Sequence, residues 1–168
     1  MTDSADSQVF VVPPDQGESF WQPVPANGYA EVRVSHRKHP AITGCATGIQ
    51  VVAPGCYIRE HVHPAQEEIL FIAEGDGVAV IDGNSHPMPQ GTTVYIGAGH
   101  RHKLVNGSAS QPMKMCWVMI PGGDDGLDDF FARIGRTRKP GEPAPEPFPR
   151  PADIDQIEAA TVFSKIDA

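Results

Sequence analysis

The sequence predicts an all-β sandwich or barrel, and two observations support this prediction. Glycine and proline number 17 each among the 168 residues, a share well above the average for globular proteins. Because an interior proline costs about 3 kcal/mol of helix stability, this composition disfavours a helical bundle. Short apolar or alternating segments also recur between turn signals from residue 44 to residue 123, which is the pattern of a sandwich or barrel built from short strands.

The individual strands are predicted from alternation and from the turns that bound them. Residues 29–34 alternate apolar and polar side chains, as a half-buried strand does. The turn Glu74-Gly75-Asp76-Gly77 between two apolar segments predicts a hairpin. Further strands are predicted over residues 48–52, 68–73, 78–81, 92–96 and 113–120.

The texture of the chain predicts three regions: an N-terminal arm over residues 1–24, a barrel over 25–121 and a C-terminal extension over 122–168. The arm contains one apolar run, residues 9–12, which predicts a strand or an arm. In the extension we expect a helix from Leu127 to Ile134, where Gly135 ends it, and a weaker helix over residues 153–162. Between them, six prolines in residues 140–151 predict an extended, polyproline-like segment.

Composition also limits the partners and the location. A net charge of −8 argues against nucleic acid, which is bound by neutralising its phosphates. No apolar run approaches the roughly 18 residues of a membrane span, and the N-terminus lacks the features of a signal peptide. We therefore expect a cytoplasmic protein with no membrane partner. The three cysteines are widely spaced, which excludes a zinc ribbon and disfavours a disulfide framework.

One constellation of residues indicates metal chemistry. His61 and His63 are two residues apart, so on a strand their side chains point to the same face. Glu68 opens the next predicted strand, and Glu67 beside it has the opposite parity. His102 brings a further imidazole from a distant strand. Three neutral imidazoles and one carboxylate form a nitrogen–oxygen site for one divalent metal ion, and four ligands leave coordination positions for water or a small-molecule substrate.

These stretches resemble the two signature motifs of the cupin superfamily. The first motif is matched by Gly55, His61, His63, Glu68 and Gly75. The second is matched by Gly91, Gly99, His102 and Asn106, with Gly97 at the position where the family has proline. The resemblance implies the cupin double-stranded β-helix, a jelly-roll β-barrel, here with a short helical and proline-rich C-terminal extension. The spacing to Gly75 favours Glu68 as the carboxylate ligand, and Glu67 stays open as the alternative.

The resemblance also implies a class of activity. Many cupins with an intact set of three histidines and one glutamate are mononuclear metal oxidoreductases. We therefore expect a dioxygenase-type enzyme that uses Fe(II), with Mn, Ni or Zn as alternatives, and acts on a small organic, phenolic substrate, with Glu68 as its catalytic base. Two other classes stay open: a non-redox cupin enzyme such as a sugar isomerase, epimerase or lyase, and a non-catalytic small-molecule-binding or accessory subunit.

The substrate-binding residues are predicted less directly. His100 shares the parity of His102, which makes it a candidate acid or base at the mouth of the pocket or else an exposed loop histidine. Met115 and Trp117 line the cavity if the odd-numbered residues of strand 113–120 face inward, and the even-numbered set is the alternative. Tyr95 is a further candidate with the same ambiguity between lining a pocket and packing in a core.

The oligomeric state is predicted from strand edges. The end strand near residues 9–12 and the open edge of a two-sheet barrel need covering, and small cupins resemble homodimers that exchange or pair such arms. We therefore expect a homodimer, in which the C-terminal extension is available to dock a partner protein.

Overall fold

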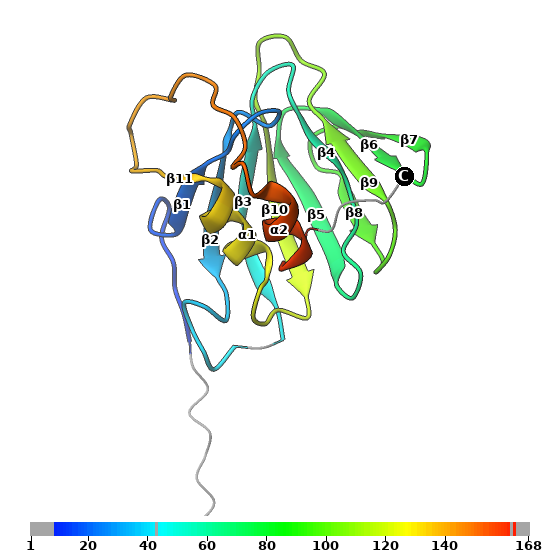
Figure 1. Cartoon of the computed structure of the whole chain (residues 1–168). Coiled ribbons are helices and arrows are strands. Elements are labelled where there is room, and N and C mark those ends of the chain that lie inside the picture. Colours follow the sequence, from blue (N-terminus) through cyan, green and yellow to red (C-terminus); the bar gives the residue numbers. More distant parts are fainter. Residues whose placement is uncertain (1–8, 43, 162, 164–168) are drawn as a thin grey trace, which may run out of the picture.

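Two antiparallel sheets face each other in the computed structural model, which describes residues 9–42, 44–161 and 163 (Figure 1). The larger sheet contains β1 (Glu18–Trp21), β2 (Tyr29–Val34), β3 (Ala46–Val52), β5 (Glu67–Glu74), β8 (Thr93–Ile96), β10 (Met113–Ile120) and β11 (Arg136–Thr137). The smaller sheet contains β4 (Tyr57–His61), β6 (Gly77–Ile81), β7 (Asn84–Met88) and β9 (His102–Val105). The strand orders are β11-β1-β2-β3-β10-β5-β8 and β4-β9-β6-β7. This architecture confirms the predicted all-β, cupin-type jelly roll.

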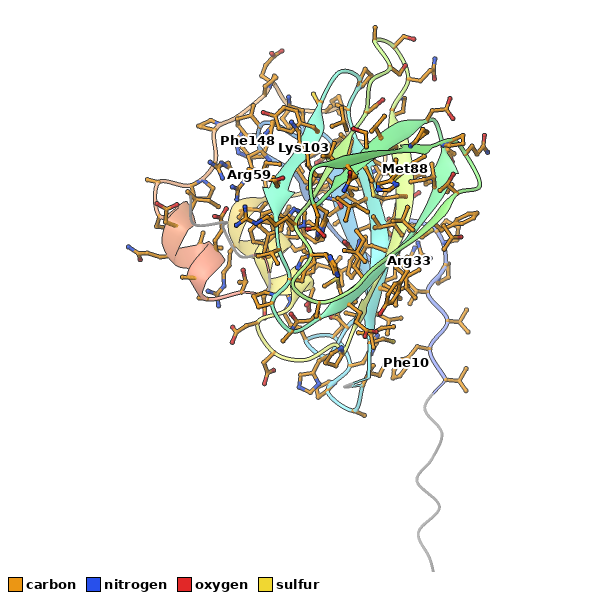
Figure 2. All side chains as sticks on the ribbon, turned by 90° about the vertical axis from the view of Figure 1, so that its right-hand side faces the viewer. Phe10, Arg33, Arg59, Met88, Lys103 and Phe148 are labelled. Atoms are coloured by element: carbon orange, nitrogen blue, oxygen red, sulfur yellow. The ribbon has the colours of Figure 1, made fainter. Side chains whose placement is uncertain are left out.

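The core fills the space between the two sheets (Figure 2). Strand β10 settles the parity that the sequence left open, because its odd-numbered residues are buried and its even-numbered residues are partly exposed. Met115 and Trp117 are therefore completely buried, together with Leu70 and Ile72 from the neighbouring strand β5. Alternation along each strand thus places one apolar face on the core, as expected for packed antiparallel sheets.

Two helices extend the barrel beside the smaller sheet. Helix α1 (Leu127–Ile134) lies over the larger sheet and buries Leu127, Phe130, Phe131 and Ile134, as the sequence predicted for this segment. Helix α2 (Ile154–Ala159) packs against α1 and is shorter than the segment predicted over residues 153–162, of which residue 162 lies outside the described part of the chain (Figure 1). Neither helix is long and apolar enough to cross a membrane.

Some elements differ from the sequence-based expectation. Strand β1 lies within the predicted N-terminal arm. Its residues Ser19 and Phe20 are buried, although most of the arm is polar. Residues 9–12 form no strand, and residues 1–8 lie outside the described part of the chain. Residues around His86, for which the sequence predicts no strand, form β7, whose side chains other than Met88 are exposed. An outward-facing strand carries no apolar alternation, so the sequence pattern could not reveal it.

Backbone conformation explains why glycine is present at two positions of the motifs. Gly75 has a φ of +75° in the hairpin between β5 and β6, and a Cβ there would lie 2.5 Å from the Pro112 carbonyl oxygen. Gly99 has a φ of +80°, and its N–H donates to the His63 carbonyl oxygen at 2.9 Å. A side chain is disfavoured at positive φ, so glycine at these turns sets the course of the strands that carry the histidines.

The motif asparagine has a structural role as well. The buried Asn106 side-chain amide donates to the carbonyl oxygens of Val52, Ala53 and Gln111 at 2.9 to 3.1 Å, and its Oδ1 accepts from the Ser108 N–H. One side chain therefore satisfies four backbone groups near the ends of β3 and β9. Asn106 joins the two sheets and lies outside the cluster of histidines.

Gly48 offers a direct test of this packing. A Cβ at Gly48 would lie 2.1 Å from the Glu31 carbonyl oxygen and 2.6 Å from the Trp117 ring, so we expect Gly48→Ala to lower the free energy of unfolding by about 1–3 kcal/mol through overpacking. Chemical denaturation measures this change. Gly107→Ala is the control, because a Cβ there meets no atom within 4 Å. Equal stability of the two variants would contradict the close contact of β3 with Trp117.

Candidate metal centre

Three histidines converge at one end of the barrel. His61 is the last residue of β4, His63 follows two residues later, and His102 is the first residue of β9, in register with His61. All three are buried, and each offers a ring nitrogen that lies within 4.8 Å of the other two. The pairing of β4 with β9 thus brings together imidazoles that are about 40 residues apart in the sequence.

Glu68 comes from the opposite sheet and completes the cluster. Its Oε2 lies 3.2 Å from Nε2 of His102 and 3.8 Å from Nε2 of His63, and the side chain is buried. Glu67 is partly exposed on the other face of β5, where a hydrogen bond with its carboxylate raises the pKa of Tyr95. The alternation along β5 therefore directs Glu68 and not Glu67 to the histidines.

Backbone hydrogen bonds orient two of the imidazoles. Nδ1 of His61 lies 2.8 Å from the Arg59 carbonyl oxygen, and Nδ1 of His102 lies 2.9 Å from the His100 carbonyl oxygen. Because a carbonyl oxygen only accepts, each Nδ1 carries the proton, and in the neutral ring Nε2 presents a lone pair. This arrangement of a hydrogen-bonded Nδ1 and a free Nε2 is typical of histidine as a metal ligand.

The contact of His102 with Glu68 requires a positive charge. With Nδ1 protonated, Nε2 of His102 and Oε2 of Glu68 are two buried acceptors that face each other at 3.2 Å, and neither has a regular hydrogen-bond partner among the described residues. Two facing lone pairs in a buried site repel unless a cation lies between them. A proton on His102 or a divalent metal ion satisfies both atoms.

The electrostatics of the cluster keep His61 and Glu68 in the protonation states in which they bind metal. Burial and the neighbouring His102 and His63 lower the pKa of His61 well below its usual range, so His61 is neutral at pH 7. Burial raises the pKa of Glu68, but His102 and His63 outweigh burial, and the net shift is downward. Burial lowers the pKa of His102, but the Glu68 carboxylate outweighs burial, and the net shift of this pKa is upward. Glu68 is therefore an ionised carboxylate beside a neutral His61.

These residues fit a single divalent ion. Bonds of about 2.0–2.2 Å from nitrogen and oxygen to such an ion place neighbouring ligand atoms roughly 3–4 Å apart, which is close to the spacing of this cluster. Imidazole and carboxylate ligands suit Fe, Mn, Ni or Zn, so the donor set does not select one metal.

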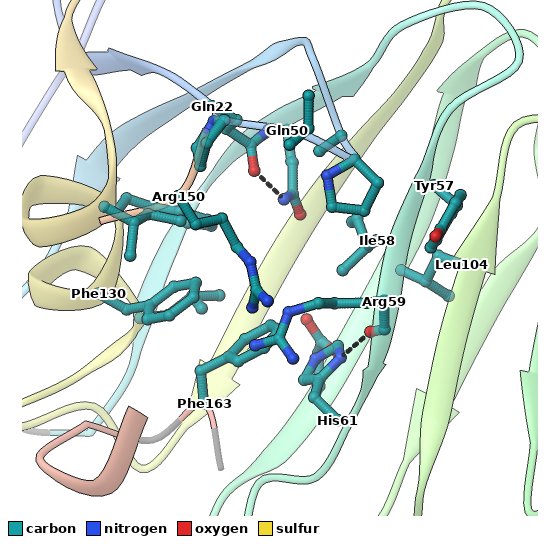
Figure 3. Close-up of a pocket in the computed structure, with 18 residues that line it drawn as sticks. Gln22, Gln50, Tyr57, Ile58, Arg59, His61, Leu104, Phe130, Arg150 and Phe163 are labelled. Atoms are coloured by element: carbon teal, nitrogen blue, oxygen red, sulfur yellow. Dashed lines mark hydrogen bonds between the residues drawn. The ribbon is translucent and has the colours of Figure 1, made fainter. Parts of the chain in front are cut away.

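A cavity adjoins the candidate metal ligands (Figure 3). His61 and Glu68 form part of its wall, and its volume is about 40 Å³. Apolar side chains of residues 23–26, β4, β9 and α1 supply most of the remaining wall, and two arginines and two glutamines add polar groups. These residues include Ile58, Leu104, Phe130, Arg59, Arg150, Gln22, Gln50 and, from the C-terminal end, Phe163.

The four predicted substrate residues lie elsewhere. Tyr95, which is 60% exposed, and His100 line an open pocket of about 350 Å³ on the outside of the barrel, where His100 Nδ1 lies 2.5 Å from Asp82 Oδ2. Met115 and Trp117 face the core, and the Trp117 ring packs 5.9 Å from that of Phe131. None of these four residues is among the described residues that line the small cavity. Their role in substrate binding therefore stays a prediction.

The sequence did not single out the residues that close the cavity. Arg59 has the same strand parity as His61, which is a signal that it lies beside the histidines. Arg150 and Phe163 come from the extension, about 90 and 100 residues further along the chain, and no local pattern predicts such contacts.

Comparison with known proteins identifies the family. The family model described as "Cupin domain" matches residues 48–119, the segment that holds all four candidate ligands. This segment of the chain is a cupin domain. The resemblance of the two motifs is thereby confirmed.

Two curated relatives come from Streptomyces. This cupin is 36% identical over 59 residues to Protein SchB of Streptomyces halstedii, a match that covers 35% of this chain and 43% of the relative. It is 25% identical over 85 residues to the tetracenomycin polyketide synthase protein TcmJ of Streptomyces glaucescens, covering 49% of this chain and 56% of the relative. The matched segment spans about half the length of these relatives.

A solved structure supports the fold. The polyketide cyclase RemF from Streptomyces resistomycificus superposes with a TM-score of 0.58 at 16% identity, covering 67% of this chain and 80% of RemF. A likeness at this identity concerns the cupin fold alone.

Exchange of the two adjacent glutamates tests the ligand assignment. Glu68→Gln removes the negative charge that faces His102, so we expect the affinity for a divalent metal to fall by at least about tenfold. Glu67→Gln is the matched control on the outer face of β5 and should leave the affinity unchanged. Isothermal titration with Zn(II) measures both. A larger loss in the Glu67 variant would overturn the assignment.

Proposed function

We propose that this cupin is a mononuclear metal-dependent oxidoreductase of the dioxygenase type that acts on a small aromatic, phenolic substrate. The observation that supports the proposal most strongly is the position of the ligand cluster: His61 and Glu68 form part of the wall of a cavity whose other walls are mainly apolar and aromatic. A cluster in that position brings an acidic substrate oxygen next to the metal ligands, while the apolar walls hold the ring.

The chain supplies a rigid set of ligands for this chemistry. An Fe(II) ion held by His61, His63, His102 and Glu68 supplies Lewis acidity and reactivity toward dioxygen. The Nδ1–H bonds to the Arg59 and His100 carbonyl oxygens fix the direction of two imidazole rings. Ligands fixed in this way keep their geometry while substrate enters and leaves.

Glu68 is suited to take a proton from the substrate. Among the described residues that line the cavity, it supplies the carboxylate, and the downward shift of its pKa keeps it ionised. A phenolic hydroxyl group placed beside His61 therefore has a proton acceptor at Oε2 of Glu68. The basicity of Glu68 is weak, so transfer is favoured for substrates whose hydroxyl is already acidified by a neighbouring positive charge.

The rest of the cavity wall offers apolar contacts to a ring and polar groups to its substituents. Ile58, Leu104 and Phe130 offer apolar contact to the faces and edges of a ring. Further from the histidines, the buried amide of Gln50 donates to Oε1 of Gln22 at 2.8 Å. This pair of amides provides a donor and an acceptor for hydroxyl or carbonyl substituents of the substrate.

A second candidate is an oxygen-independent reaction of the same metal centre, of the cyclase, isomerase or lyase type. It is favoured by the names of relatives, because TcmJ is named as a polyketide synthase protein and RemF as a polyketide cyclase. In this alternative the metal ion acts only as a Lewis acid, and the roles of Glu68 and the apolar walls are the same.

Oxygen uptake separates the two candidates. Protein loaded with Fe(II) under anaerobic conditions and then mixed with oxygenated solutions of a phenol, a catechol and a flavonoid should consume oxygen with at least one of them. Zn(II)-loaded protein is the control for metal-independent oxidation. Because Glu68 accepts the proton, Glu68→Gln should lower the rate by about 10²-fold or more. Substrate conversion without oxygen uptake would contradict the redox proposal and favour the Lewis-acid alternative.

We also propose that the protein is a homodimer located in the cytoplasm. Val9 and Val11 are more than 80% exposed, and Tyr95 on the edge strand β8 is 60% exposed, so these apolar groups lack cover within the described chain. Sedimentation velocity at micromolar concentration should give a dimer, and Val9→Asp combined with Val11→Asp should shift it toward monomer. A wild-type monomer would contradict this proposal.

A further inference from the structure

The C-terminal end of the described chain reaches into the cavity beside the metal ligands. The Phe163 ring stacks on the His61 imidazole with 3.9 Å between ring centroids and an interplanar angle of 10°. It also stacks on the Phe130 ring, at 4.3 Å and 5°. Since two rings cannot occupy the same face at these distances, Phe163 lies between His61 and Phe130 (Figure 3). The slot between these two residues therefore matches the thickness of one aromatic ring.

A carboxylate from the same C-terminal segment, which comprises α2 and Phe163, lies beside this ring. Glu158 of α2 is 1% exposed, and its Oε1 forms ion pairs with Arg59 and, at 3.4 Å, with Nη1 of Arg150. The Arg59 guanidinium also lies 5.2 Å from the centroid of the Phe163 ring. Glu158 and Phe163 thus place a carboxylate and an aromatic ring beside the same guanidinium, that of Arg59.

The volume of the cavity indicates that this segment fills a binding site. The remaining space of about 40 Å³ is far below the roughly 300–1,000 Å³ of ordinary ligand pockets, and an aromatic ring does not fit into it. The wall nevertheless has the composition of a ligand pocket, with apolar and aromatic side chains, two arginines and two metal ligands. Phe163 fills most of the space between these walls beside His61.

We propose that the cavity binds a planar aromatic carboxylate in place of the C-terminal segment. The ligand ring replaces Phe163 between His61 and Phe130, and the ligand carboxylate replaces that of Glu158 at Arg59 and Arg150. This inference deepens the proposed function, on which it rests for the role of the ligand as substrate, by naming a substrate class and a segment of this chain that competes with it.

The two arginines explain why the ligand is an anion. Burial and the nearby Arg150 lower the pKa of Arg59 to about 10, and Arg59 still carries its charge at pH 7. When Glu158 leaves, two neighbouring and partly buried guanidiniums lose their shared anion. A carboxylate on the ligand restores it with the planar geometry that guanidinium groups match best. A neutral ring lacks this second contact.

Displacement of α2 and Phe163 uncovers few buried side chains. Helix α2 has six residues, of which Ile157 and Glu158 are buried, so its departure exposes one buried apolar side chain besides the Phe163 ring. The ligand ring covers the faces of His61 and Phe130 that Phe163 leaves. While the segment is docked, it lowers the apparent affinity for the ligand in proportion to the fraction of molecules that are open. Removal of the Phe163 ring should therefore strengthen ligand binding, whereas loss of an ordinary packing residue should not.

The experiment measures binding of 2-naphthoate to the full-length, Zn(II)-loaded protein by isothermal titration calorimetry. Phe163→Ala should bind 2-naphthoate about tenfold more tightly than the wild type, as expected for a segment that is docked about nine-tenths of the time. Glu158→Gln should also tighten binding, because it weakens the hold of the segment on the two arginines. Adding Arg150→Gln to Phe163→Ala should cancel most of the gain for 2-naphthoate and leave binding of neutral 2-naphthalenemethanol unchanged.

Phe148→Ala is the matched control. Phe148 belongs to the same extension and is as buried as Phe163, but its ring packs on Arg136 and does not line the cavity. The Phe148→Ala variant should bind 2-naphthoate like the wild type. Equal affinity of the wild type, Phe163→Ala and Glu158→Gln would overturn the inference and leave Phe163 as a packing residue. If Phe163→Ala lowers the melting temperature of the barrel, Glu158→Gln, which keeps the ring, provides the same test.

The two proposals fail in different ways. Calorimetry with Zn(II) needs no turnover, so tighter binding by Phe163→Ala supports the aromatic carboxylate site even if no oxygen is consumed. Conversely, oxygen uptake with phenols by a protein whose affinity for 2-naphthoate is insensitive to Phe163 and Glu158 supports the redox function and refutes this inference.

Discussion

The site depends on the buried contact between His102 and Glu68. Two groups from opposite sheets present lone pairs to each other at 3.2 Å, in surroundings that exclude water. Such a contact destabilises the barrel unless the two groups share a cation, which is either a proton on His102 or a metal ion. His61 and His63 add further donors around the same point. The need for one positive charge thus determines which side chains face the end of the barrel.

The fold meets this requirement through strand pairing and turns. Register between β4 and β9 places His61 opposite His102, and alternation along β5 points Glu68 inward. Turns at Gly75 and Gly99 and the amide network of Asn106 hold the strand ends from which the ligands project. The ligands therefore sit on rigid strands or directly beside them, while the helices and the C-terminal segment control the space next to them.

The residues of the candidate metal site could be predicted from the sequence because they are encoded locally. His61 and His63 share a face through two-residue periodicity, and the spacing to Gly75 favours Glu68. The parity of strand 113–120 could not be predicted, since both sets of residues are largely apolar. The partners of the cavity, Arg150 and Phe163, lie in an extension whose contacts are made over about 100 residues of sequence, and long-range contacts of this kind leave no periodic signal.

The central claim is that one divalent ion is bound among the three imidazoles and Glu68. The most direct measurement is an anomalous difference map, recorded at the absorption edge of the metal, from a crystal of the metal-loaded protein. We predict one peak per chain, about 2.0–2.2 Å from Nε2 of His61, His63 and His102 and from a carboxylate oxygen of Glu68. A metal peak located only on the surface of the protein, or no peak in a crystal whose protein contains metal by elemental analysis, would contradict the account.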